Sequence, residues 1–122
     1  MTTTDSNKQT VLRLWDAFRA GDTAAFDSLI SEDYVQHNPN IGNGLAAVKA
    51  FFEPFGPLDI EVHRIAAEGD LVFIHSNFKT WNVAGVDIFR VGDDGKLVEH
   101  WDVQNPVPDK TVSGNDVFSR LS

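Results

Sequence analysis

The first half of the chain carries apolar residues at helical spacing. Within residues 11–20 they recur at i, i+3, i+4 and i+7, which marks one face of a helix. These positions are Val11, Leu14, Trp15 and Phe18. Ser6 and Gln9 predict a capping box at the start of this helix, and Gly21 predicts its end. The segment is therefore expected to pack against a core as an amphipathic helix.

Two more helices and one strand are expected before the pattern changes. Asp22 or Thr23 can cap a short second helix. The apolar side of that helix consists of Phe26, Leu29 and Ile30. Residues 33–37 are typical of a short strand, and residues 38–44 form a loop rich in Asn, Pro and Gly. A third helix is predicted over residues 45–52 and ends before a proline.

Beyond the third helix the period of the pattern becomes two. Alternation of apolar and polar residues predicts four strands, over residues 58–67, 71–81, 85–91 and 96–105. The short connections "EGD", "NVAG" and "GDDG" predict antiparallel hairpins. Helices followed by strands indicate an α+β fold, in which the helices pack on one face of a curved antiparallel sheet and leave a pocket at its open end. A single domain over residues 1–122 is expected.

The hairpin formed by the last two strands has two candidate registers. A two-residue turn of Asp94 and Gly95 places Asp87 opposite Asp102 and brings one set of side chains to one face. That set is Asp87, Phe89 and Val91 on one strand, and Val98, His100 and Asp102 on the other. A three-residue loop over residues 93–95 reverses the face and places Asp87 beside Trp101. The pattern alone leaves both registers open.

The first register has distinctive chemistry. Two carboxylates directly opposite each other repel, so in a partly dry pocket at least one of Asp87 and Asp102 should have a raised pKa. His100 would stabilise the remaining charge, and such a cluster suits proton transfer. The alternative is that His100 and Asp102 face solvent on the outer surface of the sheet, where charged strand residues are mostly found.

Composition narrows the classes of function. The net charge of −8 disfavours electrostatic contact with nucleic acid or an anionic membrane. Cysteine is absent, so the chain has neither a disulfide nor a thiol nucleophile. No apolar run predicts a secretory signal or a membrane span, and a cytoplasmic protein is expected. No phosphate-binding loop or GxSxG motif indicates nucleotide binding or serine hydrolysis.

Several segments together resemble a known superfamily. The segments "AFRAGD", "FDSLISEDYVQHNP", "NGLAAV" and "VDIFRVGDDGKLVEHWDVQ" are similar to the nuclear transport factor 2-like proteins, and most of all to the SnoaL-like polyketide cyclases. The resemblance extends over about residues 8–118. It implies a cone-shaped α+β fold with a central pocket between the helices and the concave face of the sheet. It also implies a homodimer through the sheet, where Trp101 on the outer face would suit the interface.

The resemblance also implies roles for individual residues. SnoaL-like cyclases close a ring by an intramolecular aldol condensation without a cofactor, and Asp102 matches the position of their acid–base aspartate. Asp87 matches the second acid of ketosteroid isomerase, which shares the fold, and His37 falls where that enzyme carries its base. These matches favour the register in which Asp87, His100 and Asp102 face the pocket together.

Two departures limit the resemblance. The position from which ketosteroid isomerase contributes an oxyanion tyrosine corresponds to Leu14, so steroid isomerisation is not expected. Limonene epoxide hydrolases of the superfamily use an Asp-Arg-Asp arrangement. Arg90 alternates away from Asp87 on its strand, and Arg64 has no evident place between two pocket aspartates. The positions of these two arginines count against epoxide hydrolysis.

The remaining candidates are expected to bind substrate. His75 is expected either to contact a substrate oxygen or to lie in the core with its ring hydrogen-bonded to a neighbour. His63 is expected at the surface. Aromatic residues would line a pocket for a flat or cyclic ligand, or simply form the core. The substrate-binding candidates are His75, Asn38, Trp15, Phe18, Trp81 and Phe89. His37, His75 and His100 lie on separate elements without HxH or HxxxH spacing, so no metal site is expected.

The leading hypothesis is a cofactor-independent lyase or isomerase that acts on a small apolar or cyclic ketone. Asp102 or His37 would remove a proton α to the carbonyl group, and His100 or neutral Asp87 would donate a hydrogen bond to the enolate oxygen. Two alternatives stay open. The first alternative is a module that binds a small molecule without turnover. The second is an epoxide hydrolase.

Overall fold

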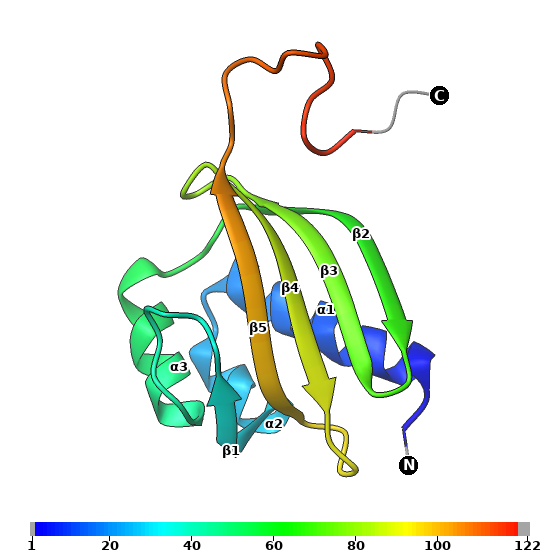
Figure 1. Ribbon diagram of the computed structural model, residues 1–122. Helices are drawn as coiled ribbons and strands as arrows, with labels where there is room; N and C mark the ends of the chain where they lie inside the picture. The colour runs from blue at the N-terminus through cyan, green and yellow to red at the C-terminus, as the bar shows by residue number, and fades with distance from the viewer. Residues whose placement is uncertain (1, 120–122) are drawn as a thin grey trace.

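The fold is a layer of helices against one curved sheet (Figure 1). The computed structural model describes residues 2–119, and over this range there are three α-helices and five strands. The helices are α1 (Thr4–Ala20), α2 (Phe26–Leu29) and α3 (Leu45–Phe52), with the 3₁₀ turns η1 (Thr23–Ala25) and η2 (Glu53–Phe55). The strands are β1 (Ile30–Gln36), β2 (Ile60–Glu68), β3 (Leu71–Phe78), β4 (Val83–Val91) and β5 (Leu97–Pro106). No helix within the described range is long and apolar enough to cross a membrane.

The sheet has the strand order β1-β5-β4-β3-β2 and is mixed. Strands β2 to β5 pair as the predicted antiparallel meander. β1 instead runs parallel to β5, with Gln36 paired to His100, so the prediction of an antiparallel sheet is wrong for this edge. β1 is followed by α3 and not by a short turn, and its partner in the sheet is the last strand, β5. The connection between these two strands therefore does not require them to run antiparallel. The described strands curve around the helices and do not close into a barrel (Figure 1).

Local hydrogen bonds determine the ends of α1. The Thr3 side chain accepts a hydrogen bond from the Ser6 amide at 3.1 Å, and Ser6 Oγ accepts from the Thr3 amide at 3.0 Å. The predicted box of Ser6 and Gln9 is therefore wrong, because Ser6 is already the third residue of the helix and Thr3 is its N-cap. Gly21 ends the helix as predicted, with a left-handed φ of 66° that glycine adopts without strain.

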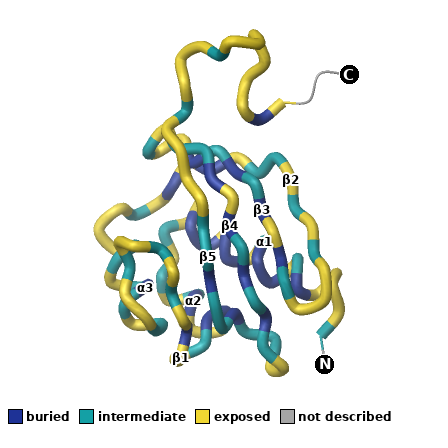
Figure 2. The backbone as a smooth tube through the Cα atoms, viewed as in Figure 1, coloured by how far each residue is buried: buried dark blue, intermediate teal, exposed yellow. Residues whose placement is uncertain are grey.

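The core lies between the helices and the concave face of the sheet (Figure 2). Trp15 of α1 is fully buried there, and its indole Nε1 donates to Ser76 Oγ on β3 at 3.0 Å. This bond satisfies the one polar group of the ring and joins α1 to the sheet. The second helix is shorter than predicted, because Ile30 is already extended and begins β1. The predicted α+β architecture is otherwise confirmed.

The turn between β4 and β5 is the longer of the two predicted candidates. The Gly92 amide donates to the Lys96 carbonyl oxygen at 2.8 Å, which leaves three residues in the loop. Gly95, the third of these, has a left-handed φ of 83°, as such a loop requires. The two-residue turn, the other candidate, is therefore not formed. By itself the observed loop would place Asp87 beside Trp101 on one face of the sheet.

A β-bulge reverses the effect of this loop. Val91 pairs with Leu97 rather than with Val98, so Val98 is an extra residue and the register moves by one. Beyond the bulge the strands pair as in the first predicted register. The confirmed pairs are Asp87 with Asp102 and Phe89 with His100. The bulge is therefore the feature that turns His100 and Asp102 towards the helices.

The C-terminal segment covers part of the outer, convex face of the sheet. After β5 the described chain contains no further helix or strand up to residue 119, and it leaves the body of the fold before it curls back (Figure 1). Phe118 is buried on this face, with its ring stacked on His63 at a centroid distance of 4.6 Å. The described residues of this segment do not line the cavity on the concave face.

Candidate active site

A cavity of about 260 Å³ opens between the helices and the concave face of the sheet. A buried water needs only about 10–15 Å³, so the cavity has room for a small organic molecule. Much of its wall is aromatic. The aromatic side chains include Trp15, Phe18, Phe52, Phe78, Trp81 and Phe89. Such a wall suits a flat or cyclic apolar ligand.

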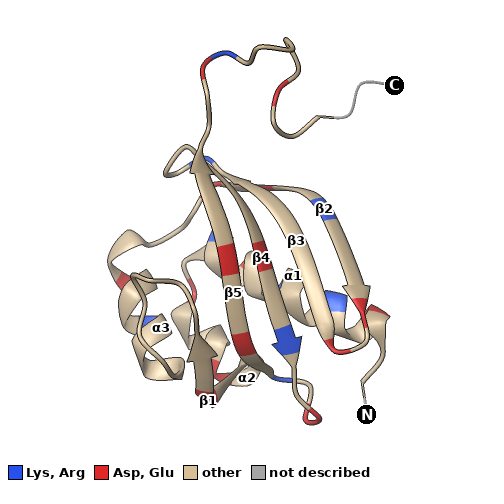
Figure 3. Cartoon of the chain, in the orientation of Figure 1, with Lys and Arg blue, Asp and Glu red and all other residues tan. Residues whose placement is uncertain are grey.

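Along the described part of the chain, the cavity wall contains acids but no permanent cation. Within residues 2–119, no lysine or arginine lines it, and the acidic position on β4 lies beside an acidic position on β5 (Figure 3). The two strand arginines are engaged on the outer face. Arg90 is 2.7 Å from Asp70, and Arg64 is 3.0 Å from His75. The only basic group at the cavity is therefore the imidazole of His100, as far as the described chain extends.

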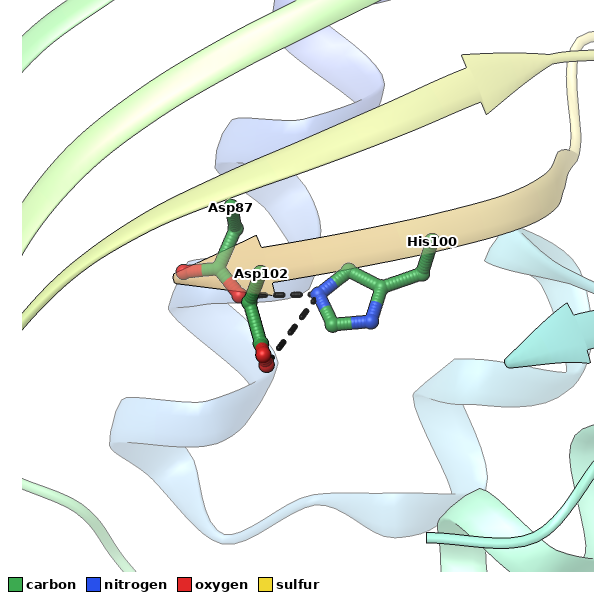
Figure 4. A group of neighbouring side chains, drawn as sticks. All are labelled: Asp87, His100 and Asp102. Atoms are coloured by element: carbon green, nitrogen blue, oxygen red, sulfur yellow. Dashed lines mark hydrogen bonds and ion pairs between the residues drawn. The ribbon is translucent and has the colours of Figure 1, made fainter. Parts of the chain in front are cut away.

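Three ionisable side chains meet at the polar end of the cavity (Figure 4). His100 Nε2 lies 2.8 Å from Asp87 Oδ1 and 3.9 Å from Asp102 Oδ2. All three side chains are more than nine-tenths buried. They come from paired positions on β4 and β5, so the first register does bring them together. At this depth a charge is unfavourable unless it is paired or hydrogen-bonded.

The end of β1 supplies two amide side chains to the same cluster. Gln36 Oε1 is hydrogen-bonded to His100 Nδ1 and to the backbone amide of Asn38. Asn38 Nδ2 donates to Asp102 Oδ2 at 2.7 Å. The parallel pairing of β1 with β5 brings these groups to the site, since Gln36 is the β1 partner of His100. Both ring nitrogens of His100 and one oxygen of Asp102 therefore have partners.

Burial dominates the electrostatics of Asp87. Removal from water raises the pKa of its carboxyl group, the hydrogen bond and charge of His100 oppose this shift, and Asp102 adds to it. The second oxygen, Asp87 Oδ2, is buried without a hydrogen-bond partner in the described part of the chain. Burial, followed by the charges of the two aspartates, also raises the pKa of Tyr34 well above its ordinary value, so this pocket tyrosine stays neutral.

Two histidines predicted in the pocket lie on the opposite face of the sheet. His37 stacks on Trp101 with ring centroids 5.0 Å apart, and its Nε2 lies 2.8 Å from Glu99 Oε2. His75 accepts a hydrogen bond from Arg64 and packs under the C-terminal segment. Both placements in the pocket are wrong, because successive strand residues point to opposite faces and the neighbours of both histidines face inward.

The other predicted binding residues do line the cavity. They are Asn38, Trp15, Phe18, Trp81 and Phe89. Sequence reasoning missed Tyr34 and Gln36, which also face the cavity. The signal that could have found them is the alternation of Tyr34, Gln36 and Asn38 in "YVQHN", which places these three side chains on one face. The sequence-based prediction instead placed His37, on the other face, in the pocket.

The cluster is also compact enough to hold a metal ion. One ligand atom each from Asp87, His100 and Asp102 lies within 4.8 Å of the others. Two carboxylates and an imidazole are common ligands of divalent transition metals. The 2.8 Å contact between His100 Nε2 and Asp87 Oδ1 is, however, a direct hydrogen bond, which an ion would have to replace. The geometry therefore fits a shared proton better than a metal ion.

Fold and site together define an α+β protein with an acid–base cluster inside an aromatic cavity. The chain belongs to the SnoaL-like domain family, which it matches over residues 11–100. The family membership expected from the sequence is thereby confirmed. No curated protein sequence matches the chain significantly.

Solved structures share the nuclear transport factor 2-like fold. A nuclear transport factor 2-like protein of unknown function from Burkholderia xenovorans is 20% identical, with a TM-score of 0.77 and 97% of each chain covered. A steroid delta-isomerase from Pseudomonas aeruginosa is 20% identical, with a TM-score of 0.64, and the match covers 89% of this chain and 82% of that one. An LEH-like epoxide hydrolase from M. tuberculosis is 18% identical, with a TM-score of 0.68 and 84% of each chain covered. At these identities the similarity establishes the fold and not a reaction.

Proposed function

We propose that the protein is a cofactor-independent acid–base enzyme that removes a proton α to a carbonyl group, as a lyase or isomerase of the SnoaL-like type. The observation that carries this proposal is the buried cluster of Asp87, His100 and Asp102 at the polar end of an aromatic cavity. Carboxylates and imidazole in such surroundings are suited to proton transfer.

Asp102 is the base in this proposal. Its side chain lines the cavity, and the hydrogen bond from Asn38 holds its carboxylate in one orientation. His37, the alternative base, stacks on Trp101 on the outer face and has no access to the cavity. The abstracted proton goes to Asp102, and the electron pair of the C–H bond enters an enolate whose charge collects on the carbonyl oxygen.

The pair formed by Asp87 and His100 stabilises that oxygen. One proton lies between His100 Nε2 and Asp87 Oδ1. As charge develops on the enolate oxygen, the hydrogen bond that this proton makes within the pair is exchanged for one to that oxygen. Return of the proton from Asp102 to another carbon completes an isomerisation. If the enolate carbon attacks a second carbonyl of the same molecule, a C–C bond forms and the new alkoxide takes the proton from Asp102, which gives the aldol product.

The cavity favours an uncharged substrate. Its described wall contains Asp87 and Asp102 but no lysine or arginine. A carboxylate or phosphate group would be buried beside these acids without a counterion, which is strongly unfavourable. A small neutral ketone that contains a ring, or that folds into one, fits the aromatic wall best.

The two alternatives share the cavity and differ in what they require of the cluster. Epoxide hydrolysis of the Asp-Arg-Asp type needs an arginine between two aspartates, whereas His100 lies between Asp87 and Asp102 here. Ligand binding without turnover needs the aromatic wall but not the carboxylate of Asp102.

Exchange of α-protons tests the proposal directly. The chelator-treated protein is incubated with neutral cyclic ketones in D₂O, and incorporation of deuterium is followed by NMR. We expect exchange above background in the wild type, and a loss on the order of 10²- to 10⁴-fold in Asp102→Asn. His37→Gln, which changes a histidine of the outer face, is the matched control and should exchange at the wild-type rate.

Three outcomes would contradict this proposal. An unchanged rate in Asp102→Asn would exclude this residue as the base. Thermal stabilisation by a ketone that shows no exchange would indicate a binding module. Loss of exchange on chelation, with recovery on addition of a divalent ion, would indicate a metal-dependent site.

A further inference from the structure

Gln36 lines the cavity beside the cluster, and the proposed chemistry assigns it no role. It ends β1 and lies beside His100 in the parallel pairing with β5. Its side-chain oxygen meets two nitrogen atoms: the backbone amide of Asn38 at 3.0 Å, and Nδ1 of His100. These two contacts together define the hydrogen positions around the imidazole.

The contact with Asn38 determines which end of the Gln36 amide faces the cluster. A backbone amide only donates, so the atom that it meets must be an acceptor, which is the carbonyl oxygen rather than the NH₂ group of Gln36. A carbonyl oxygen only accepts. His100 Nδ1 must therefore carry a hydrogen and donate it to Gln36.

This assignment leaves His100 Nε2 to share its proton with Asp87. When the imidazole is neutral, Nε2 has no hydrogen, and the proton in the 2.8 Å contact belongs to the Asp87 carboxyl group. When the imidazole is charged, the same proton is on Nε2 and Asp87 is ionised. In both states the pair holds one proton in this contact and has no net charge.

We propose that Gln36 is a positioning residue, which keeps the hydrogen of neutral His100 on Nδ1 so that the transferable proton of the Asp87–His100 pair lies between Nε2 and Asp87 Oδ1. The opposite tautomer would bring a bare Nδ1 against the carbonyl oxygen of Gln36, which places two acceptors in contact. The catalytic consequence rests on the proposed function, whereas the tautomer is a property of the free protein.

The tautomer is measured without substrate. Long-range ¹H–¹⁵N correlation spectra of the labelled protein distinguish a protonated ring nitrogen from a bare one, and the signals lost in His100→Gln identify this residue. We expect Nδ1 of His100 to be protonated in the wild type. A bare Nδ1 with a protonated Nε2 would overturn the proposal, whatever the activity.

Variants of Gln36 test the cause of this preference. Gln36→Met keeps the length of the side chain and removes the acceptor, so we expect a mixture of His100 tautomers. We also expect kcat for α-proton exchange to fall on the order of 10²-fold, with KM little changed. Gln36→Glu restores an acceptor oxygen and should restore the Nδ1-protonated tautomer. An unaltered His100 spectrum in Gln36→Met would overturn the proposal.

Asn43→Ala is the matched control for strand order. Asn43 Oδ1 accepts a hydrogen bond from the backbone amide of Gln36 at 2.8 Å, so the variant loosens the same end of β1 without changing the Gln36 side chain. It should leave the His100 spectrum and kcat unchanged. If it reproduces the effects of Gln36→Met, Gln36 acts only through the order of the strand, and the proposal fails.

The two proposals fail in different ways. If Nδ1 is protonated and Gln36→Met changes it, yet no ketone exchanges its α-protons, the assignment of Gln36 is supported while the proposed function is contradicted. If exchange requires Asp102 but Nδ1 is bare, the function is supported and the role of Gln36 is overturned.

Discussion

At the scale of single residues, the surroundings of Asp87 favour chemistry over stability. One of its oxygens is bonded to His100, and the other is buried without a partner among the described residues. An unsatisfied buried oxygen destabilises the folded state, and the carboxylate of Asp102 on the neighbouring strand adds repulsion. Such an arrangement is typical of groups that gain and lose a proton during a reaction.

We predict that Asp87→Asn raises the free energy of unfolding by about 1 kcal/mol at neutral pH. Because burial raises the pKa of Asp87 in the folded state, the folded protein holds this proton more tightly than the unfolded chain does. Stabilisation by the proton is complete below the ordinary pKa of about 4 and is lost as the pH rises through the raised value. Asparagine does not titrate, so the advantage of the variant should grow from about pH 4 to neutral pH. Urea unfolding at several pH values measures this, and a constant advantage would contradict it.

The residues of the cluster were predictable from sequence because alternation on two neighbouring strands, together with the family resemblance, places Asp87, His100 and Asp102 on one face. The errors at His37 and His75 have a single cause. One step along a strand exchanges its faces, and a histidine is compatible with either of them. Gln36 was not predicted because its role depends on a contact between strands that are distant in the sequence.

At the scale of secondary structure, the β4–β5 hairpin combines two deviations that cancel. The three-residue loop moves the register by one residue, and the bulge at Val98 moves it back. A sequence shows where a turn lies but not whether a bulge follows it, which is why alternation left both registers open. Gly92 makes room for the bulge, since a Cβ there would lie 2.8 Å from Val98 Cγ1.

We predict that Gly92→Ala lowers the free energy of unfolding by about 1–3 kcal/mol, as an overpacked contact does. Val98→Ala removes the methyl group that the new Cβ meets, so the double variant should recover most of the loss. Denaturant unfolding of both single variants and of the double variant gives their coupling energy. Strictly additive effects would mean that Gly92 does not act through Val98.

The partner of β1 was not predictable in the way that the meander was. Short turns between β2, β3, β4 and β5 indicate that consecutive strands pair. β1 is separated from β5 by α3 and three strands, and nothing in the seven residues Ile30–Gln36 identifies a distant partner.

At the scale of the whole molecule, the two faces of the sheet differ in kind. The concave face bears the cavity, whereas the convex face exposes apolar side chains. These include Phe73, Val86 and Val103, which are 36%, 37% and 66% exposed. Trp101 lies on this face against the ring of His37. Clustered apolar exposure is typical of a protein-binding surface, and the resemblance makes a second copy of this chain the expected partner.

We predict a homodimer formed through the convex face. Val86→Lys should shift the protein towards monomer in sedimentation equilibrium, because the new charge would be buried without a partner. Val112→Lys is the matched control, since Val112 is fully exposed in the C-terminal segment and lies outside the sheet. It should leave the mass unchanged, and a wild-type monomer at every concentration would contradict the prediction.

Gln36 and His100 are 64 positions apart in the chain, and in the described structure three residue pairs join β1 to β5. Closure of so long a loop carries an entropic penalty that few contacts must offset, so docking of β1 is expected late in folding. As a thinly paired edge strand, β1 is also expected to open before the meander does, with early hydrogen exchange of its amides. Each opening withdraws Gln36 and its neighbour Asn38 while the β4–β5 hairpin stays formed. The competence of the site thus reports whether β1 is docked on β5.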